Sequence, residues 1–484
     1  MLVDYLVIAL YIAGILGIGW FGMRLAKTKS DYLVAGRRLG TFLYSGTMSA
    51  IVLGGASTVG GVALGYEFGI SGSWLVATIG LGIFVLHAAF ARKLVRLRLY
   101  TVSEMLDLRY GGGASSAVSG IVMWAYTLML TVTSMVAFGK VFTALFDLPS
   151  VAGIAIGGGL VLLYTVLGGM WSVTLTDIAQ FVVMTIGFLL VLLPFALTAA
   201  GGVDGLRARL DPSYFQLDSI GWDTILTYVL IYGFGLLIGQ DIWQRVFTAR
   251  SPRVATAGGI GSGVYCLIYA VAGAVIGTVA KARYPDLANA DDAFTRIVED
   301  LLPAGLRGLV LAAALSALMS TASGTLIACS TVSANDIFGK LGLRGAGGES
   351  SLRTNRLTTI ALGVVAIAVS LLISDVVAAL TVAYNLLVGG LLVAILGALF
   401  WRRGTKAGAL TSMGVGSVAV IGSMIGHGLQ ANEPIYFGLG AGLLSYVAVS
   451  LATPPTPQPV LAAWDARLSG TDAAHDVPTG ADHG

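Results

Sequence analysis

Charged side chains are scarce in this sequence. Aspartate, glutamate, lysine and arginine make up 11% of its 484 residues, whereas soluble proteins carry about 25%. Hydrophobic residues account for 56%. This balance excludes a soluble globular protein, and nothing in a net charge of +3 indicates a nucleic-acid partner. The composition predicts a polytopic membrane protein surrounded by the lipid bilayer, with roughly a dozen helices of about 20 residues each.

Reactive and metal-binding residues are also few. The two cysteines, Cys266 and Cys329, lie inside apolar runs, and the four histidines do not cluster. This excludes a disulfide framework and a thiolate metal site. No GxxxxGK[ST] phosphate loop and no evident nucleophile and base pair occur, so ATP-driven transport and membrane catalysis lack the residues that they need. We therefore expect neither an enzyme nor an organic cofactor. The absence of a short selectivity-filter motif also disfavours an ion channel.

Apolar runs of membrane-spanning length predict about thirteen helices. They cover residues 3–22, 41–67, 73–91, 114–146, 150–167, 173–198, 221–245, 256–281, 306–336, 357–375, 376–400, 406–427 and 434–453. No basic segment precedes the first run, and Arg24, Lys27 and Lys29 follow it. We therefore expect a retained anchor with its N-terminus outside, rather than a cleaved signal peptide.

Basic residues are distributed unevenly among the loops. If the N-terminus is outside, the cytoplasmic loops and helix ends hold twenty lysines and arginines, and the external connections hold six. This asymmetry follows the positive-inside rule. It predicts a multi-pass protein of the cell (inner) membrane with its C-terminus in the cytoplasm.

Two of the predicted spans are interrupted by glycine. The span over 41–67 contains Gly-Gly-Ala-Ser-Thr-Val-Gly-Gly at residues 54–61, and the span over 221–245 contains three glycines at residues 232–241. Each glycine costs a helix about 0.8–1 kcal/mol relative to alanine. Both stretches are therefore expected to unwind at mid-membrane, where irregular backbone is tolerated if it lines a cavity.

Each interrupted span begins a segment of five predicted helices. Because five is odd, the two segments enter the membrane from opposite sides, which makes them an inverted repeat. Paired broken helices in such repeats indicate an alternating-access transporter with its site at the midplane. The expected division is an N-terminal helix and first cytoplasmic loop (1–40), a first repeat (41–199), an external loop (200–220), a second repeat (221–402), two C-terminal helices (403–453) and a disordered cytoplasmic tail (454–484).

Hydroxyl side chains gather in the predicted helix over 306–336. Ser316, Ser320 and Ser323 follow one another at helical spacing and share one face. One interpretation is tight packing through small residues, which membrane bundles favour. The other is a sodium site, because hard cations prefer oxygen ligands and the unwound residues 54–61 would supply carbonyls beside this face.

Four motifs give the sequence a specific resemblance. It resembles the solute:sodium symporter family, over about residues 3 to 430, in YLVAGR at residues 32–37, GGMWSV leading to TDIAQ at 168–180, QRVFTAR at 244–250 and ALMSTASG at 317–324. The resemblance implies an all-α membrane protein with a LeuT-type five-plus-five inverted repeat, one additional N-terminal helix and about two additional C-terminal helices. It also implies solute import driven by the sodium gradient, and we expect a monomer.

The resemblance further implies a set of sodium ligands. Matched by position, these are the backbone carbonyls of Ala56, Val59 and Ala317 and the side-chain hydroxyls of Ser320 and Thr321.

In some members an aspartate matching Asp177 joins hydroxyls at the positions of Ser320, Ser323 and Gly324 to hold a second sodium. Glycine at position 324 removes one of those ligands. Coupling to one sodium is therefore expected, with Asp177 and Ser323 on a release path; the alternative is a carboxylate that only pins the helix.

The remaining polar and glycine positions of the breaks predict a solute pocket. Its expected members are Gly54, Gly55, Ser57, Thr58, Gly60, Gly239, Gln240 and Tyr384. Free N–H groups at half-helix ends favour anions, so a small organic anion or zwitterion, such as a carboxylate or an amino acid, is expected. A sugar, vitamin or urea transporter is the alternative. Choline is disfavoured, because neither break carries a tryptophan or tyrosine at its centre to form an aromatic cage.

Overall fold

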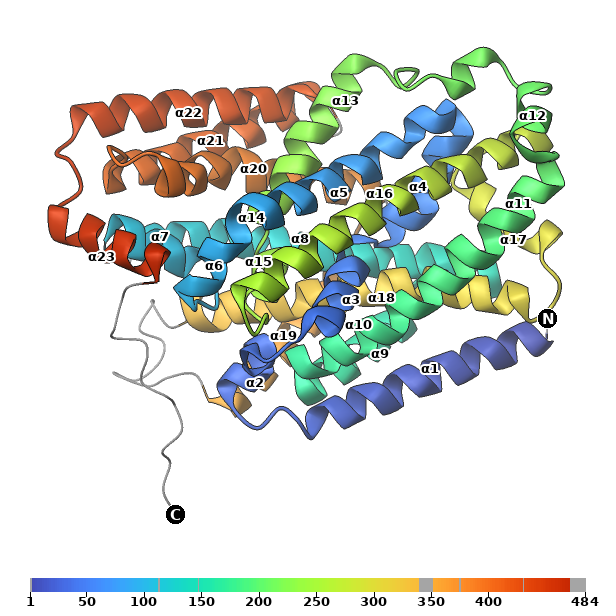
Figure 1. The fold of residues 1–484 in the computed structure, drawn as a ribbon, viewed down its shortest axis with the longest axis horizontal. Helices are drawn as coiled ribbons and strands as arrows, with labels where there is room; N and C mark the ends of the chain where they lie inside the picture. Colours follow the sequence, from blue (N-terminus) through green and yellow to red (C-terminus); the bar gives the residue numbers. More distant parts are fainter. Residues whose placement is uncertain are drawn as a thin grey trace.

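The computed structural model describes residues 2–111, 114–146, 148–338, 351–373, 376–429 and 431–470. Within these ranges the chain is almost entirely helical, and the one β-type contact is a single bridge between Leu39 and Ala249. Most of the long helices run along one axis of the molecule (Figure 1). This is the arrangement that apolar helices adopt to cross a bilayer.

The helices follow the predicted order. The N-terminal part contains α1 (Leu2–Met23), α2 (Lys29–Val34) and η1 (Ala35–Arg37). The first repeat contains α3 (Thr41–Val52), α4 (Gly55–Phe68), η2 (Gly69–Ser73), α5 (Trp74–Val85), η3 (Leu86–Phe90), α6 (Ala91–Leu97), α7 (Val102–Tyr110), α8 (Ala114–Phe146), α9 (Ser150–Gly168), α10 (Met170–Met184), η4 (Thr185–Leu192) and α11 (Leu193–Ala200).

The connection and the second half complete the fold. The connection contains α12 (Gly202–Arg207) and η5 (Pro212–Phe215). The second repeat contains α13 (Trp222–Tyr228), η6 (Val229–Gly233), α14 (Phe234–Ile238), α15 (Gln240–Val246), α16 (Pro252–Arg283), α17 (Asp292–Leu301), α18 (Leu306–Val332), η7 (Ser333–Ile337), α19 (Leu352–Ser370) and α20 (Val376–Phe400). The C-terminal part contains α21 (Lys406–His427), α22 (Glu433–Ala452) and α23 (Gln458–Ser469).

The number of membrane spans differs from the expected thirteen when it is counted by length and composition. Among the described residues, eleven helices are long and apolar enough, or twelve if the bent pair Trp222–Ile238 and Gln240–Val246 is one span. That count treats Gly55–Leu97 as one helix, although its chain turns at Gly69, where φ is +62°. The total of thirteen stays a prediction.

Contacts with α16 show that α4 and α5 run in opposite directions. Ser45 in α3 bonds to Gly258 of α16, and Thr58 in α4 bonds to Tyr269 of α16. The residue numbers therefore increase in the same direction along both segments. In α5 and η3 the order is reversed, because Gly80 faces Cys266 whereas His87 faces Gly259. The broken helix α3–α4 is therefore parallel to α16, and the segment that follows it is antiparallel.

Both expected breaks are present, but each is shorter than predicted. The first comprises Leu53 and Gly54, which lie between α3 and α4, so most of residues 54–61 are helical. The second is Gly239, whose extended backbone separates α14 from α15. The expectation that the whole of 54–61 unwinds is wrong, because one extended glycine is enough to start a new helix and the following glycines still form its backbone hydrogen bonds.

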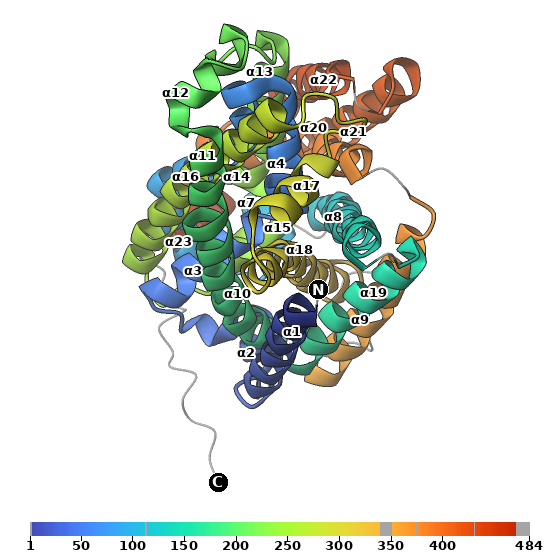
Figure 2. The same ribbon diagram turned by 90° about the vertical axis from the view of Figure 1, so that its right-hand side faces the viewer.

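Helix α18 is the centre of the bundle. From Val310 to Val332 every residue except Thr321 is buried, and Figure 2 shows the helix surrounded by the other helices when the molecule is viewed along the bundle. Its core-facing surface consists largely of alanine, serine and threonine, which let neighbouring backbones approach closely. The hydroxyl-rich face predicted from the sequence is thus held in the interior.

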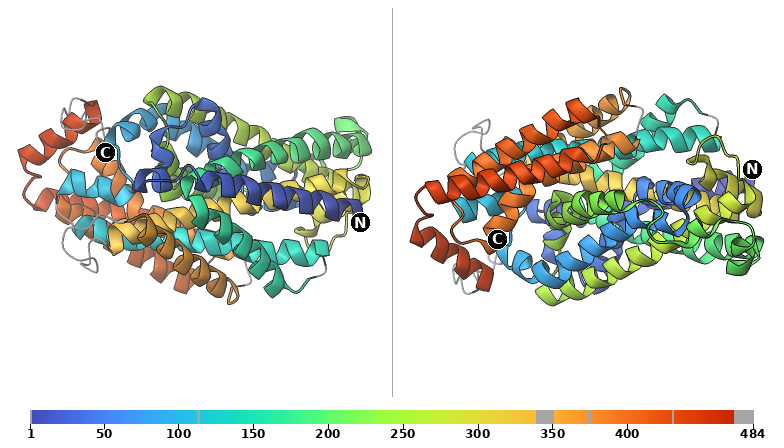
Figure 3. Two further views of the ribbon diagram at one scale, coloured as in Figure 1. Left: turned by 90° about the horizontal axis from the view of Figure 1, so that it is seen from below. Right: turned by 90° about the horizontal axis from the view of Figure 1, so that it is seen from above.

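The two ends of the bundle are distinct. At one end, here called the α17 end, lie α12, α17 and the N-terminus, and α6, α7 and α23 lie at the other end (Figure 1). Figure 3 shows α1 on one flank and α21 and α22 on the opposite side. The carboxylate of Asp4 holds α1 in place. It accepts hydrogen bonds from Gly305 N and Gly308 N and forms an ion pair with Arg307.

The C-terminal segment differs from the expected disordered tail. Residues Gln458–Ser469 form α23, which packs on α6 and α7. Leu461 and Trp464 are buried, and Asp465 pairs with Arg402 at 3.0 Å. The proline-rich start of this segment therefore leads into an amphipathic helix; the rest of the predicted tail, 471–484, lies outside the described residues.

Candidate functional site

The first break places free backbone carbonyls next to α18. Leu53 ends α3, and Gly54, with φ −75° and ψ −168°, begins α4. A helix leaves its last four carbonyls without intrahelical partners, so the end of α3 presents acceptor oxygens. Gly54 also allows close approach, because a Cβ atom there would lie 2.7 Å from the Thr321 hydroxyl.

Two hydroxyls of α18 meet these carbonyls. The Ser320 hydroxyl donates to Ala50 O at 2.8 Å and to Ala317 O at 3.1 Å. The Thr321 hydroxyl donates to Ile51 O at 2.8 Å. The five oxygen atoms come from neutral groups, and a cation that replaces the hydroxyl protons as their partner would find a set of hard ligands.

Ala56 and Val59 occupy a different place from these carbonyls. Both lie in the first two turns of α4, where they line the cavities described below. The contacts of Ser320 and Thr321 go instead to Ala50 and Ile51, at the end of α3. The family position of the two carbonyls stays a prediction, and the geometry adds α3 to the set of candidate ligands.

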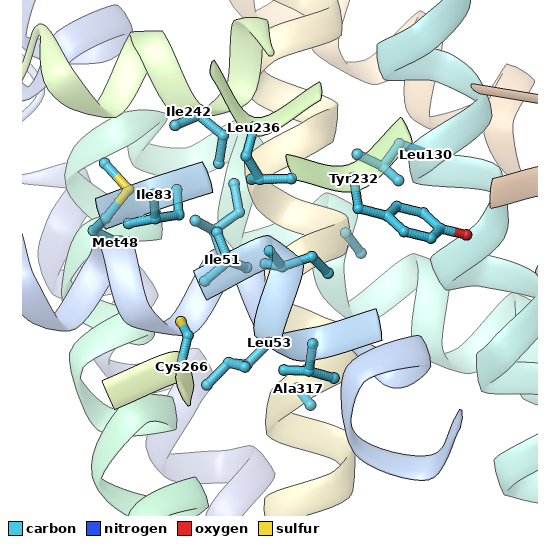
Figure 4. Close-up of a cluster of buried hydrophobic side chains, with 14 of the residues drawn as sticks. Met48, Ile51, Leu53, Ile83, Leu130, Tyr232, Leu236, Ile242, Cys266 and Ala317 are labelled. Atoms are coloured by element: carbon cyan, nitrogen blue, oxygen red, sulfur yellow. The ribbon is translucent and has the colours of Figure 1, made fainter. Parts of the chain in front are cut away.

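Apolar side chains pack around the breaks. Figure 4 shows Ile51 of α3, Leu236 of α14 and Ile242 of α15 close together where the two broken helices meet, with Leu53 on the side of Ala317. All of them are nearly or fully buried. A polar solute or an ion at this point would therefore lie in largely apolar surroundings, where electrostatic interactions are stronger than in water.

Asp177 forms a buried ion pair that the sequence did not indicate. Its Oδ2 accepts a hydrogen bond from Arg245 at 2.9 Å and another from the Thr47 hydroxyl at 2.5 Å. Both charged side chains are fully buried. The Arg245 guanidinium also donates to the backbone carbonyl of Asp241, at 3.4 Å. The pair joins α10, α3 and α15 next to the breaks.

Gly324 and Ser323 lie beside this pair without completing an ion cage. A Cβ atom on Gly324 would lie 2.6 Å from the Arg245 guanidinium, so the arginine uses the space that a larger residue would fill. The Ser323 hydroxyl donates to Ser320 O within α18. The positive charge of the Arg245 side chain thus already neutralises the Asp177 carboxylate.

A small cavity of about 50 Å³ lies between the two breaks. Its walls come from α3, α4, α5, α8, α14, α15, α18, α20 and η6. The lining residues are Ile51, Val52, Gly54, Gly55, Ala56, Ser57, Ile79, Leu130, Thr133, Ser134, Ala137, Tyr232, Leu236, Asp241, Ile242, Leu318, Thr321, Leu380 and Tyr384. The lining is mainly apolar, with several hydroxyls and one carboxylate. Thr321 belongs both to this lining and to the oxygen cluster.

A larger cavity of about 750 Å³ continues from the small one towards the α17 end. The two share Gly55, Ala56, Ala137, Leu318 and Leu380. At the α17 end the walls of the large cavity include Glu67, Lys140 and Asp291. Lys140 Nζ lies 3.8 Å from Asp291 Oδ2, and each of these two side chains is about half exposed. The small cavity is therefore approached from the α17 end through the large one.

The predicted solute residues fall into two groups. Gly54, Gly55, Ser57 and Tyr384 line the small cavity, and Gly60 lines the large one. Thr58 bonds to the Tyr269 hydroxyl, Gly239 forms the second break, and the Gln240 side chain bonds to Tyr100 O and Val102 N. These last three are outside both linings, and Gln240 secures the loop before α7.

Sequence reasoning missed three residues of α8 and η6 that line the small cavity, namely Thr133, Ser134 and Tyr232. Asp241, which lines the same cavity, is likewise not among the predicted solute residues. The expectation that the pocket has no aromatic cage needs correction, because Tyr232 and Tyr384 both line the small cavity. Their rings come from separate spans, so the centre of a break viewed alone could not reveal them.

A model of the Sodium:solute symporter family matches residues 32–416. The chain belongs to this family. The predicted all-α fold and sodium as the coupling ion are confirmed, and the protein is a sodium-coupled membrane transporter of a small solute.

Related proteins cover nearly the whole chain. It is 26% identical to the osmoregulated proline transporter OpuE of Bacillus subtilis over 96% of each chain. It is 25% identical to the sodium/proline symporter of Escherichia coli over 87% of each chain. It is 24% identical to the sodium/glucose cotransporter of Vibrio parahaemolyticus, over 87% of this chain and 84% of that one.

Solved structures agree on the LeuT-type fold. A substrate-bound, outward-open Na+-coupled sialic acid symporter aligns with a TM-score of 0.83 at 18% identity, over 94% of this chain and 98% of that chain. Mhp1, a nucleobase-cation-symport-1 family transporter, aligns with a TM-score of 0.58 at 14% identity, over 92% and 99%. At these identities the likeness concerns the arrangement of the helices.

Proposed function

We propose that this symporter imports a small zwitterionic amino acid of the proline class from the α17 side. The observation that carries the proposal is the small cavity, which combines a half-helix N-terminus, a carboxylate and an apolar wall in a space between two broken helices. The proline transporters among the relatives support the same class. The positive-inside pattern supports an external N-terminus, which makes the α17 end the outer one.

The carboxylate of the solute is placed at the N-terminus of α4. The first N–H groups of a helix have no intrahelical partners and carry part of the positive end of its dipole. Gly54 O already accepts from Ser57 N and Thr58 N, so the N–H groups of Gly55 and Ala56 remain for the solute. Broken helices of other transporters bind anionic groups in this way.

Sodium binding is placed at the oxygen cluster beside this N-terminus. Its members are the Ser320 and Thr321 hydroxyls, the Ala317 carbonyl and the carbonyls at the end of α3, with the Ala56 and Val59 carbonyls as the ligands predicted from the family. A sodium ion there would replace protein hydrogen bonds and fix α3 against α18. Because Thr321 also lines the solute cavity, ion and solute would stabilise the same arrangement.

One sodium per solute is the proposed stoichiometry. The Asp177 carboxylate is paired with Arg245, and Gly324 offers no oxygen ligand. The other carboxylate oxygen, Asp177 Oδ1, is buried without a hydrogen-bond partner among the described residues. Asp177 is therefore assigned to the path of sodium release rather than to a second resting site. The transporter is proposed to act as a monomer.

Sodium-dependent thermal stabilisation tests the solute class. We expect L-proline to raise the melting temperature of the purified protein by about 2 °C or more in sodium and not in potassium, because a ligand that binds the native state stabilises it by mass action. Glucose, urea and acetate serve as matched probes of the alternative classes. A sodium-dependent shift with one of these and with no amino acid would contradict the proposal.

A further inference from the structure

One carboxylate in the solute cavity has no assigned partner of opposite charge. Asp241 is the one acidic or basic residue among the described residues that line the small cavity. It is 3% exposed and lies in the first turn of α15, directly after the break at Gly239. Neither the oxygen cluster nor the N-terminus of α4 explains an acid at this place.

The basic residue one turn further along α15 forms an ion pair with a different carboxylate. Arg245 lies one turn further along α15, but its guanidinium pairs with Asp177 at 2.9 Å and touches only the backbone carbonyl of Asp241, at 3.4 Å. Within the part of the chain that the structure describes, no ion pair involves the Asp241 carboxylate. Burying an ionised carboxylate without a cation is costly, so a positive charge is expected to join it.

Aromatic rings surround the same point. The Tyr126 hydroxyl donates to Asp241 Oδ1 at 3.0 Å. The Tyr384 ring meets the Tyr126 ring edge-on at 5.4 Å between centroids, and the Tyr232 ring at 5.3 Å. Ring faces attract cations, and the hydrogen bond from Tyr126 fixes the orientation of the carboxylate. Tyr232 and Tyr384 line the cavity together with Asp241, and Tyr126 holds the carboxylate from behind the lining.

Another part of the cavity lining attracts a negative charge. Gly55 and Ala56 at the start of α4 line the same small cavity as Asp241. The remaining wall is provided by Leu130, Ile79 and other apolar side chains. A molecule that carries an anionic and a cationic group on a small apolar frame matches all three parts of the lining.

We propose that Asp241 determines solute specificity by binding the protonated nitrogen of the solute through its carboxylate. The inference rests on the proposed function and deepens it. The cavity then selects α-amino or imino acids with small apolar side chains and rejects carboxylates that lack the nitrogen. A site built to bind an N–H group discriminates strongly against analogues without it, because its own polar group is left unpaired.

Two probes that differ at the nitrogen test this role. L-proline and cyclopentanecarboxylate share the five-membered ring and the carboxylate, but the second has carbon in place of the ring nitrogen. Sodium-driven uptake of each is measured with the full chain in proteoliposomes, together with its thermal stabilisation of the purified protein. In the wild type we expect proline to be preferred by about 100-fold or more in KM.

Asp241→Asn keeps the size of the side chain and removes its charge. The variant is expected to raise the KM for proline about 30-fold or more, to leave the affinity for cyclopentanecarboxylate within about threefold, and so to lose most of the preference. Asp241→Glu retains the charge and is expected to keep a preference for proline, with weaker binding. Asp223→Asn, an exposed acid in the same broken span, is the matched control and should behave as the wild type.

An unchanged preference for proline in Asp241→Asn overturns the inference and leaves the proposed function intact. If the wild type neither accumulates nor is stabilised by any amino acid in sodium, both are wrong. If Asp241→Asn is folded but inactive in uptake, the thermal shifts of the two probes decide: equal loss for both contradicts the role in nitrogen binding, and selective loss for proline supports it.

Discussion

Thr321→Ala is expected to raise the sodium concentration for half-maximal uptake by about 10- to 100-fold. The hydroxyl lies 2.8 Å from Ile51 O, where it would change from hydrogen-bond donor to sodium ligand. Contacts between a polar group and a charge contribute about 1.5–3 kcal/mol, and each 1.4 kcal/mol corresponds to a tenfold change in affinity. Ser320→Ala is expected to have an effect of the same size. The measurement is solute uptake as a function of external sodium.

The matched control for this prediction is Ser316→Ala. Ser316 lies one turn before Ser320 on the same face of α18, but its hydroxyl contacts Tyr11 on α1 and the backbone of its own helix. Sodium dependence within about twofold of the wild type is expected. If all three variants keep the wild-type sodium dependence, the oxygen cluster is not the sodium site. If Ser316→Ala changes it as much as Thr321→Ala, the effect comes from general packing of α18.

Breaking the ion pair between Asp177 and Arg245 should produce the largest loss of stability. Asp177→Asn and Arg245→Gln are each expected to cost about 3–5 kcal/mol, because each leaves the other charge buried and unpaired. The double variant removes both charges and should be more stable than either single variant. Thermal unfolding in detergent, followed by a double-mutant cycle, measures the coupling.

Arg402→Gln provides the control for that cycle. Arg402 pairs with Asp465 at 3.0 Å, but its side chain is 72% exposed, and exposed pairs contribute about 0–1 kcal/mol. Its melting temperature should stay close to that of the wild type. Additive losses in the double variant of Asp177 and Arg245 would mean that the two charges do not stabilise one another, and the assignment of Arg245 as the partner of Asp177 would be wrong.

The spans and the order of the repeats could be predicted from the sequence because membrane thickness sets the length of an apolar run. The hydroxyls of Ser320 and Thr321 attracted attention for a related reason, since polar groups in such runs are expensive and need a partner. Their role as sodium ligands comes from the family resemblance and stays a prediction. The prediction of where the first break lies was less accurate. Glycine content indicates where a helix is weak, but neighbouring contacts decide which peptide leaves the helix.

Contacts between distant residues were beyond sequence reasoning. Asp177 and Arg245 belong to different repeats, and no periodicity along the chain shows that α10 and α15 meet. The Gln240 side chain bonds to the loop before α7 rather than to the cavity, which depends on the packing of α15. The cluster of Tyr126, Tyr232 and Tyr384 comes from three spans, so its proximity to Asp241 required the tertiary structure.

Concentrative uptake of L-proline into proteoliposomes is the most direct test of sodium-coupled import of a zwitterion. With sodium outside and potassium inside, the protein is expected to accumulate proline above its external concentration. The accumulation should disappear when external sodium is replaced by potassium. Proline flux that only equilibrates, or accumulation that persists without a sodium gradient, would contradict the account.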